Sequence, residues 1–275
     1  MLGLRPGDIA LDNGCGTAKF AAWNADKVGL MVGSDPATLF ADAAVEQVAL
    51  AKADSRCLPF ANNSFDKAFS LDVLEHFPRE VIDAYLKETA RVLRPGGRFF
   101  IMSNTSDPSS LQPLTDASRK LGQLLVRAGL YDFQREARRK SDHIKALRTW
   151  QDVLDAMEQA GLRPVRIVFW NSVFTSFVEH VLMKLGEAAL GRKTKDNHVP
   201  TAPSSSVVGP SSADGTHREI RARQRIRQRL ERRGPAYYAL TAVTLLMELD
   251  LWLFGALKSG SYCMVVEKPV TPRDS

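Results

Sequence analysis

Short apolar segments alternate with longer amphipathic segments over the first hundred residues of this 275-residue chain. Short apolar runs that end at turn residues are typical of buried strands, and a 3.6-residue period is typical of helices. We expect strands at residues 8–12, 30–34, 48–53, 67–71 and 98–103. Helices are expected between them, at residues 20–28, 38–45 and 78–93. Strands that alternate with helices form a parallel sheet covered on both faces, so the pattern predicts an α/β fold.

The alternation is interrupted after residue 103 and then resumes. The first interruption holds expected helices at residues 114–130 and 132–143. A helix at 150–160, which ends at Gly161, and a strand at 165–170 then continue the pattern.

A second interruption of about ninety residues follows. In chain order it holds an apolar helix at 176–190, a linker at 191–216, an arginine-rich helix and a long apolar helix at 237–257. The linker is rich in Ser, Pro, Gly and Thr, a composition typical of disordered segments. A strand at 262–267 brings the sheet to seven strands.

These boundaries divide the chain into a core and two helical insertions that form a cap. The predicted units are a core at 1–103, an insertion at 104–148, a core helix and strand at 149–170, an insertion at 171–260 and a final core strand at 261–268.

Cysteine usage and the amino terminus favour an intracellular protein. Cys15, Cys57 and Cys263 are far apart in the sequence, which argues against a disulfide framework or a zinc site and fits a reducing compartment. No signal-peptide pattern precedes the first strand, so we expect a cytoplasmic location. Met1 lies almost directly before this strand, where related folds often have a helix, and the sequence leaves open whether the amino terminus is complete.

Positive charge is concentrated in residues 217–233. This segment holds eight arginines, opposed by Glu219 and Glu231, in a chain of net charge +6. Basic runs attract the phosphates of nucleic acid or of anionic lipid. The alternative is a solvated helix face.

A glycine-rich loop follows the first expected strand. Residues 11–18 have the sequence LDNGCGTA, and glycines in such a loop allow a tight turn and close approach of a ligand. Asp35 ends the second strand, where a carboxylate can accept hydrogen bonds from ribose hydroxyls. Dinucleotide binding would require GxGxxG, whose last glycine is absent here.

Together with motifs further along, this loop resembles the class I S-adenosylmethionine (SAM)-dependent methyltransferases, in particular the small-molecule group called methyltransferase-11. The family has an acidic residue followed by GxGxG, which LDNGCGTA matches except that Ala18 replaces the last glycine. Residues 53–60 resemble the adenine-contacting segment, residues 63–77 the fourth strand with its exit, and residues 91–98 (RVLRPGGR) the helix-turn-strand signature. The resemblance spans residues 7–103 and implies a Rossmann-like fold with SAM as cofactor and no metal.

The resemblance also implies roles for individual residues. Gly14 and Gly16 would lie against the methionine part of SAM, and Asp12 near its amino group, unless Asp12 only orders the loop. Asp35 would bind the ribose hydroxyls. The remaining cofactor residues would be Asp54 and Ser55 at the adenine, and Leu71 and Asp72 near the transferring methyl group; Asp54 has the alternative role of a turn residue.

Methyl transfer from a sulfonium depends mainly on positioning, although a hydroxyl acceptor benefits from a general base. His76, just past the fourth strand, is the candidate base, with a packing histidine as the alternative. Glu75 is a second candidate, or a residue that caps or pairs.

The long insertions indicate a hydrophobic acceptor. In this family the segments after strands four to six cover the active site and select the acceptor. Residues 237–257 are apolar, but Glu248 and Asp250 lie near their middle and argue against a membrane-spanning helix, because a buried Asp costs roughly 2.5–3.5 kcal/mol. We expect a hydrophobic or lipid-like acceptor, such as a prenyl-quinone or isoprenoid.

Residues 217–257 also favour a peripheral position at the inner face of the membrane, because arginines hold anionic head groups while an apolar helix with Trp252 and Phe254 enters the lipid. The alternatives for the apolar helix are a lid and a dimer contact.

Two further functions fit the sequence. The loop also resembles that of the tRNA wobble-uridine methyltransferases, and the arginines would then bind RNA phosphates. The apolar helices have no role in RNA binding, so nucleic acid is the less favoured partner. The other possibility is a non-catalytic SAM-binding protein.

Overall fold

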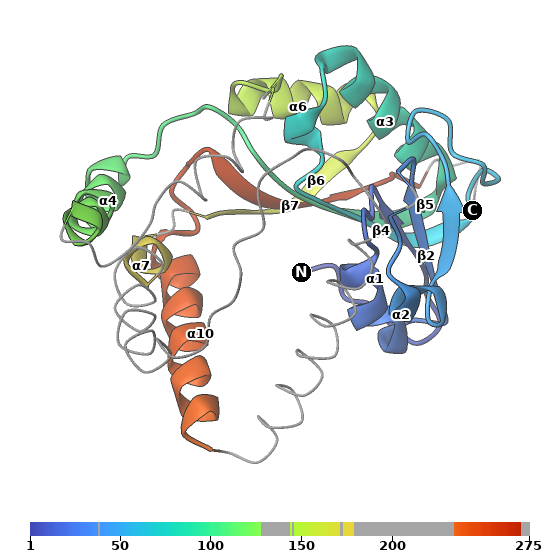
Figure 1. Ribbon diagram of the computed structural model, residues 1–275. Helices are drawn as coiled ribbons and strands as arrows, with labels where there is room; N and C mark the ends of the chain where they lie inside the picture. Colours follow the sequence, from blue (N-terminus) through green and yellow to red (C-terminus); the bar gives the residue numbers. More distant parts are fainter. Residues whose placement is uncertain (38, 128–143, 145, 171–172, 179–233, 271–275) are drawn as a thin grey trace, which may run out of the picture.

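One seven-stranded sheet organises the part of the chain that the computed structural model describes, residues 1–37, 39–127, 144, 146–170, 173–178 and 234–270. The strand order is β3-β2-β1-β4-β5-β7-β6 (Figure 1). The strands are β1 (Ile9–Asn13), β2 (Leu30–Asp35), β3 (Ala49–Lys52), β4 (Phe65–Leu71), β5 (Leu93–Asn104), β6 (Arg163–Phe169) and β7 (Ser261–Glu267). Strand β7 is antiparallel to β5 and β6, and the other pairs are parallel. The predicted mostly parallel α/β sheet is confirmed.

Helices cover both faces of this sheet (Figure 1). They are α1 (Lys19–Asn24), α2 (Asp42–Val45), α3 (Arg79–Val92), α4 (Gln112–Arg127), α6 (Trp150–Gln159), α7 (Val173–Phe177) and α10 (Pro235–Phe254), with 3-10 turns η1 (Ala25–Lys27) and η2 (Leu74–His76). On one face α3 and α6 bury large side chains such as Tyr85 and Met157 against the sheet. On the other face α1 and α2 pack through small residues such as Ala21 and Ala44.

The turn predicted between the third helix and the fifth strand is a bulge within β5. Strand β5 begins at Leu93, which pairs with Phe65, and the register shifts before Lys67 pairs with Arg98. Gly96 has φ +76°, and a Cβ on Gly97 would lie 2.7 Å from the Arg94 carbonyl oxygen. The two glycines therefore let the strand absorb extra residues instead of starting after them.

The second predicted helix, 38–45, is shorter in the structure. Residue 38 lies outside the described residues, and α2 begins at Asp42. Ala41 is extended, and its N–H donates to the Thr17 carbonyl at 3.1 Å. The backbone before α2 thus binds the glycine-rich loop and does not continue a helix.

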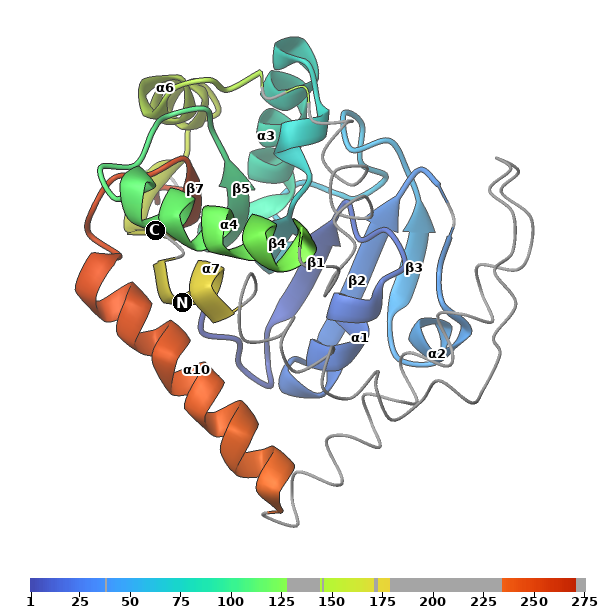
Figure 2. The same cartoon turned by 60° about the vertical axis from the view of Figure 1, so that its left-hand side comes forward.

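The described helices of the two insertions contact each other away from α1 and α2 (Figure 2). Helix α7 contacts both α4 and α10. The end of α10 is joined to the sheet, because the Phe169 N–H donates to the Gly255 carbonyl at 2.8 Å. None of the described helices combines the length and the apolar composition needed to cross a membrane.

Several predicted segments lie outside the described residues. They are the helix at 132–143, residues 179–190 of the helix at 176–190, the linker at 191–216 and the arginine-rich helix at 217–233.

Candidate active site

The glycine-rich loop leaves the carboxyl end of β1 in an unusual backbone conformation. Gly14, Gly16 and Ala18 have φ values of +85°, +52° and +56°, so Ala18 adopts the left-handed conformation that the missing family glycine would adopt without strain. A Cβ on Gly14 would lie 2.8 Å from Val73 Cγ2, whereas a Cβ on Gly16 would meet nothing within 4 Å. The loop therefore packs tightly at Gly14 and borders open space at Gly16.

Buried polar contacts fix the start of this loop. The Asn13 side chain donates to Thr89 Oγ1 at 2.9 Å, and Tyr85 Oη donates to the Asn13 carbonyl at 2.8 Å. Both partners lie on α3. The N–H groups of Gly14 and Cys15 donate to the Ser34 carbonyl at 2.8 and 3.0 Å, which joins the loop to β2.

Asp35, at the end of β2, is held by backbone N–H groups. Its Oδ2 accepts from the Gly16 N–H at 2.9 Å, and its Oδ1 accepts from the Ala37 N–H at 2.8 Å. The carboxylate is half-buried beside the loop. This position fits the predicted ribose contact.

Asp12 lies in the core below the loop, with 3% of its surface exposed. Burial, and then the charge of Asp35, raise the pKa of the Asp12 carboxyl to about 8. A buried carboxyl with this pKa is ready to ionise beside a cationic group such as an ammonium. Burial, then Asp12 and Asp35, also raise the pKa of the Cys15 thiol, which stays protonated.

The adenine segment follows β3, next to β2. The Ala53 N–H donates to the Asp35 carbonyl at 3.3 Å, which brings the two strand ends together. Arg56 Nη2 lies 2.6 Å from Asp54 Oδ2 on the surface, and hydrogen bonds from Arg56 lower the pKa of Asp54 to about 2. Ser55 is buried. A ligand amine would therefore share Asp54 with Arg56.

The structure places Leu71 and Asp72 at the end of β4, beside β1. Leu71 is half-buried against the small-residue cluster around α1. Asp72 is exposed with φ +53°, and its N–H donates to the Met102 carbonyl at 3.0 Å. The predicted cofactor residues thus come from four neighbouring strand ends, where ligands of open α/β sheets bind.

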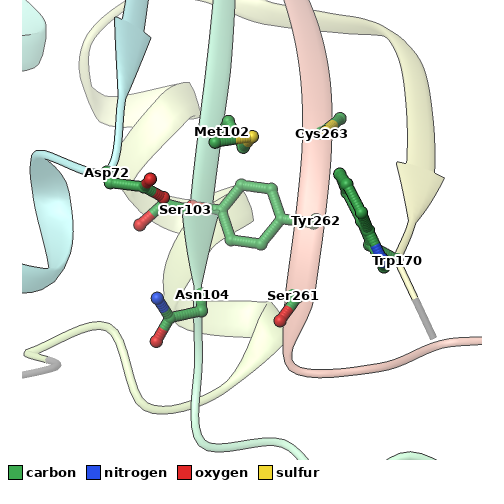
Figure 3. Close-up of a pocket in the computed structure, with 8 residues that line it drawn as sticks. All are labelled: Asp72, Met102, Ser103, Asn104, Trp170, Ser261, Tyr262 and Cys263. Carbon is green, nitrogen blue, oxygen red and sulfur yellow. The ribbon is translucent and has the colours of Figure 1, made fainter. Parts of the chain in front are cut away.

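A cavity of about 170 Å³ lies on the β5 side of Asp72 (Figure 3). Its walls are the ends of β5 and β7, where Met102, Ser103 and Asn104 pair with Cys263, Tyr262 and Ser261, together with Trp170 directly after β6. The lining residues are Asp72, Met102, Ser103, Asn104, Trp170, Ser261, Tyr262 and Cys263. Asp72 is the member of this set that the sequence predicted as a site residue. Most of the others are brought together by the pairing of β5 with β7, whose residues lie more than 150 positions apart in the sequence.

Glu75 is hydrogen-bonded to two residues that line this cavity. Its side chain is buried; Oε2 accepts from Ser103 Oγ at 2.8 Å, and Oε1 accepts from Asn104 Nδ2 at 3.1 Å. Glu75 is therefore hydrogen-bonded to two residues of the cavity lining, and its role as a base stays a prediction. His76 is half-buried in η2 and is not one of the cavity's lining residues, and its role as a base stays a prediction.

A second, apolar cavity of about 410 Å³ lies among the insertion helices. Its lining comprises Leu114 and Ser118 of α4, Val173, Phe174 and Phe177 of α7, Val178, and Leu246 of α10. Trp170 lines the first cavity, and Val173, three residues further along, lines the second. Among the described residues, no group of three His, Cys, Asp or Glu side chains is arranged to hold a metal ion.

Comparison with known proteins supports this interpretation of the core. Residues 11–101, from β1 to β5, match the family model described as a methyltransferase domain. The chain is 36% identical over 110 residues to methyltransferase GfsG of Streptomyces halstedii, which covers 36% of this chain and 39% of that protein. It is 35% identical over 106 residues to the probable tRNA methyltransferase 9B of Mus musculus, which covers 35% and 22%. Other curated relatives are named as quinone and sterol methyltransferases.

The whole fold is similar to phosphoethanolamine N-methyltransferase 2 of Haemonchus contortus, solved in complex with SAM. The TM-score is 0.53 at 16% identity, over 98% of this chain and 50% of that chain. Fold and site define a class I SAM-dependent methyltransferase domain. Residues 11–101 thus match a methyltransferase domain, as the motifs of this part of the chain predicted, and this match supports SAM as the cofactor. The matched part spans less than half the length of these two curated relatives.

Proposed function

We propose that this protein transfers a methyl group from SAM to a hydrophobic small-molecule acceptor. The observation that carries the proposal is the apolar cavity between α4, α7 and α10, whose lining residue Val173 follows Trp170 of the cavity at the strand ends by three residues. Its volume of about 410 Å³ lies within the range of small-molecule sites, and its lining is apolar apart from Ser118. An acceptor with an apolar body fits this lining, while its polar end reaches the cavity beside Asp72.

The protein's own contribution is to bind and orient both molecules. When bound, SAM supplies a methyl group already activated on a sulfonium. The open space at Gly16, the carboxyl group of Asp12 and the carboxylate of Asp35 fit such a ligand. Glu75 fixes Ser103 and Asn104, which orient the polar end of the acceptor. The apolar lining excludes water from the acceptor.

Transfer of labelled methyl groups tests the proposal. Purified protein and methyl-labelled SAM are incubated with a cell extract, and label is counted in lipid, RNA, protein and polar fractions. We expect label in the organic-soluble fraction, and we expect Asp35→Ala to abolish it. Asp26→Ala, at an exposed carboxylate of η1, is the matched control and should leave the labelling unchanged.

A second variant separates acceptor binding from cofactor binding. Leu246→Asp places a charge in the apolar cavity and should lower the organic-soluble label by roughly tenfold or more while SAM still binds in calorimetry. Leu121→Asp, at an exposed position of α4 that does not line the cavity, should have no effect. If these two variants give equal organic-soluble label, the apolar cavity does not bind the acceptor.

RNA methylation is the second candidate, because the chain is similar to a probable tRNA methyltransferase. Label in the RNA fraction that Asp35→Ala removes and Leu246→Asp does not would favour it over the hydrophobic acceptor.

A further inference from the structure

Four large side chains form one exposed stripe along α10. Tyr238, Leu245, Leu249 and Trp252 are 61%, 58%, 40% and 79% exposed. They follow one another at intervals of seven, four and three residues, so they lie on one face of the helix. A contiguous exposed apolar surface of this kind marks a site for a partner protein or a membrane.

The helix stands away from the sheet and is joined to it at one end. Figures 1 and 2 both show α10 extending from β6 and β7 with α7 alongside. Glu248 and Asp250 are the charged residues of α10, and Asp250 is 3% exposed. The outward surface of this twenty-residue helix therefore carries a single carboxylate, near its carboxyl end.

The sequence immediately before α10 identifies what the stripe contacts. Residues 217–233 carry eight arginines and two glutamates, and Gly234 and Pro235 join them to the helix. We propose that α10 docks on an anionic membrane surface, with the stripe in the boundary between head groups and acyl chains; the basic composition of the preceding sequence favours anionic lipid as the partner. A second copy of the chain would bring an equally basic segment to the same place, and RNA would leave the apolar stripe exposed to water.

Docking in this way would also give a lipid-soluble acceptor a direct route to its site. Leu246, next to the stripe on the same helix, lines the apolar cavity. The membrane proposal itself stands on α10 and the arginine-rich sequence, and it holds whether or not the chain transfers methyl groups.

Sedimentation of the full chain with vesicles tests the proposal. Vesicles of phosphatidylcholine alone are compared with vesicles that also contain phosphatidylglycerol, at low and high salt. We expect the protein to sediment with the anionic vesicles, less completely at high salt. The double variant Leu245→Glu/Trp252→Glu should lower the bound fraction by roughly tenfold, because two apolar anchors become anionic. Val45→Glu, at an exposed apolar position on α2, controls for added charge and should bind like the wild type.

A second measurement tests lipid insertion directly. Lipids brominated near the head group should quench tryptophan fluorescence in the wild type, and Trp252→Phe should lose most of that quenching. Binding that high salt abolishes and that never quenches Trp252 would mean that the arginines act alone, which overturns the docking of α10. Failure to bind any vesicle overturns the whole proposal, as does a concentration-dependent dimer that Leu245→Glu/Trp252→Glu disrupts.

Discussion

At the scale of single residues, the buried carboxyl group of Asp12 makes stability depend on pH. Its pKa is about 8 in the folded protein, and an unfolded Asp has a pKa of about 3.9. Between these values the folded state binds more protons, so the free energy of unfolding falls as pH rises, by about 1.4 kcal/mol per pH unit for one proton. The loss ends above the folded pKa, where Asp12 is charged in both states.

Replacement of this residue gives the test. Asp12→Asn should remove that slope between about pH 5 and 7, measured by urea unfolding without SAM. Asp26→Asn, at an exposed position, should keep the slope of the wild type. If the free energy of unfolding depends on pH in the same way in the wild type and in Asp12→Asn, Asp12 is already ionised in the folded protein.

At the scale of elements, α6 depends on its first turn. Thr149 Oγ1 accepts from the Asp152 N–H at 3.2 Å, and Asp152 Oδ2 accepts from the Thr149 N–H at 2.8 Å, which together form a capping box. Thr149→Ala should lower the free energy of unfolding by about 1 kcal/mol, and Thr149→Ser should restore most of it. Urea unfolding measures both. If Thr149→Ala has the same free energy of unfolding as the wild type, the packing of Val153 and Met157 stabilises the helix without the capping box.

Elements with a clear local signal were predictable from the sequence, and elements shaped by distant contacts were not. Short apolar runs predicted six of the seven strands within two residues, and the helical period predicted α3 as closely, whereas β5 begins five residues before its predicted start. The bulge in β5 depends on how Phe65 pairs with Leu93, and the late start of α2 depends on the bond from Ala41 to Thr17. The sequence of β5 does not indicate its pairing with Phe65, and the sequence of α2 does not indicate the hydrogen bond to Thr17.

The candidate site divides in the same way. Gly14, Gly16 and Asp35 lie in one short motif and at one strand end, so their proximity follows from the β1-loop-β2 connection. Hydrogen bonds from Ser103 and Asn104 to Glu75 join the exits of β4 and β5, and Tyr262, which pairs with Ser103, comes from the last strand. Only the strand order of the finished sheet brings those residues together.

At the scale of the whole molecule, the predicted cofactor residues lie at the ends of β1, β2 and β4 and just after β3, so a bound ligand holds the middle of the sheet together. A ligand that binds only the folded state stabilises it by about 2.7 kcal/mol at a hundred times its Kd. For a chain of this size we expect SAM to raise the unfolding temperature by about 5–10 °C at that concentration.

Asp35→Ala should abolish the shift, because Asp35 is fixed by two backbone N–H groups beside the loop. Asp54→Ala should reduce it less, because Arg56 already occupies that carboxylate. Thermal unfolding followed by circular dichroism, with and without SAM, measures all three proteins. If SAM raises the unfolding temperature of Asp35→Ala as much as that of the wild type, the cofactor does not bind at the end of β2. Asp12 and Asp72 would then be the remaining candidates for its contacts.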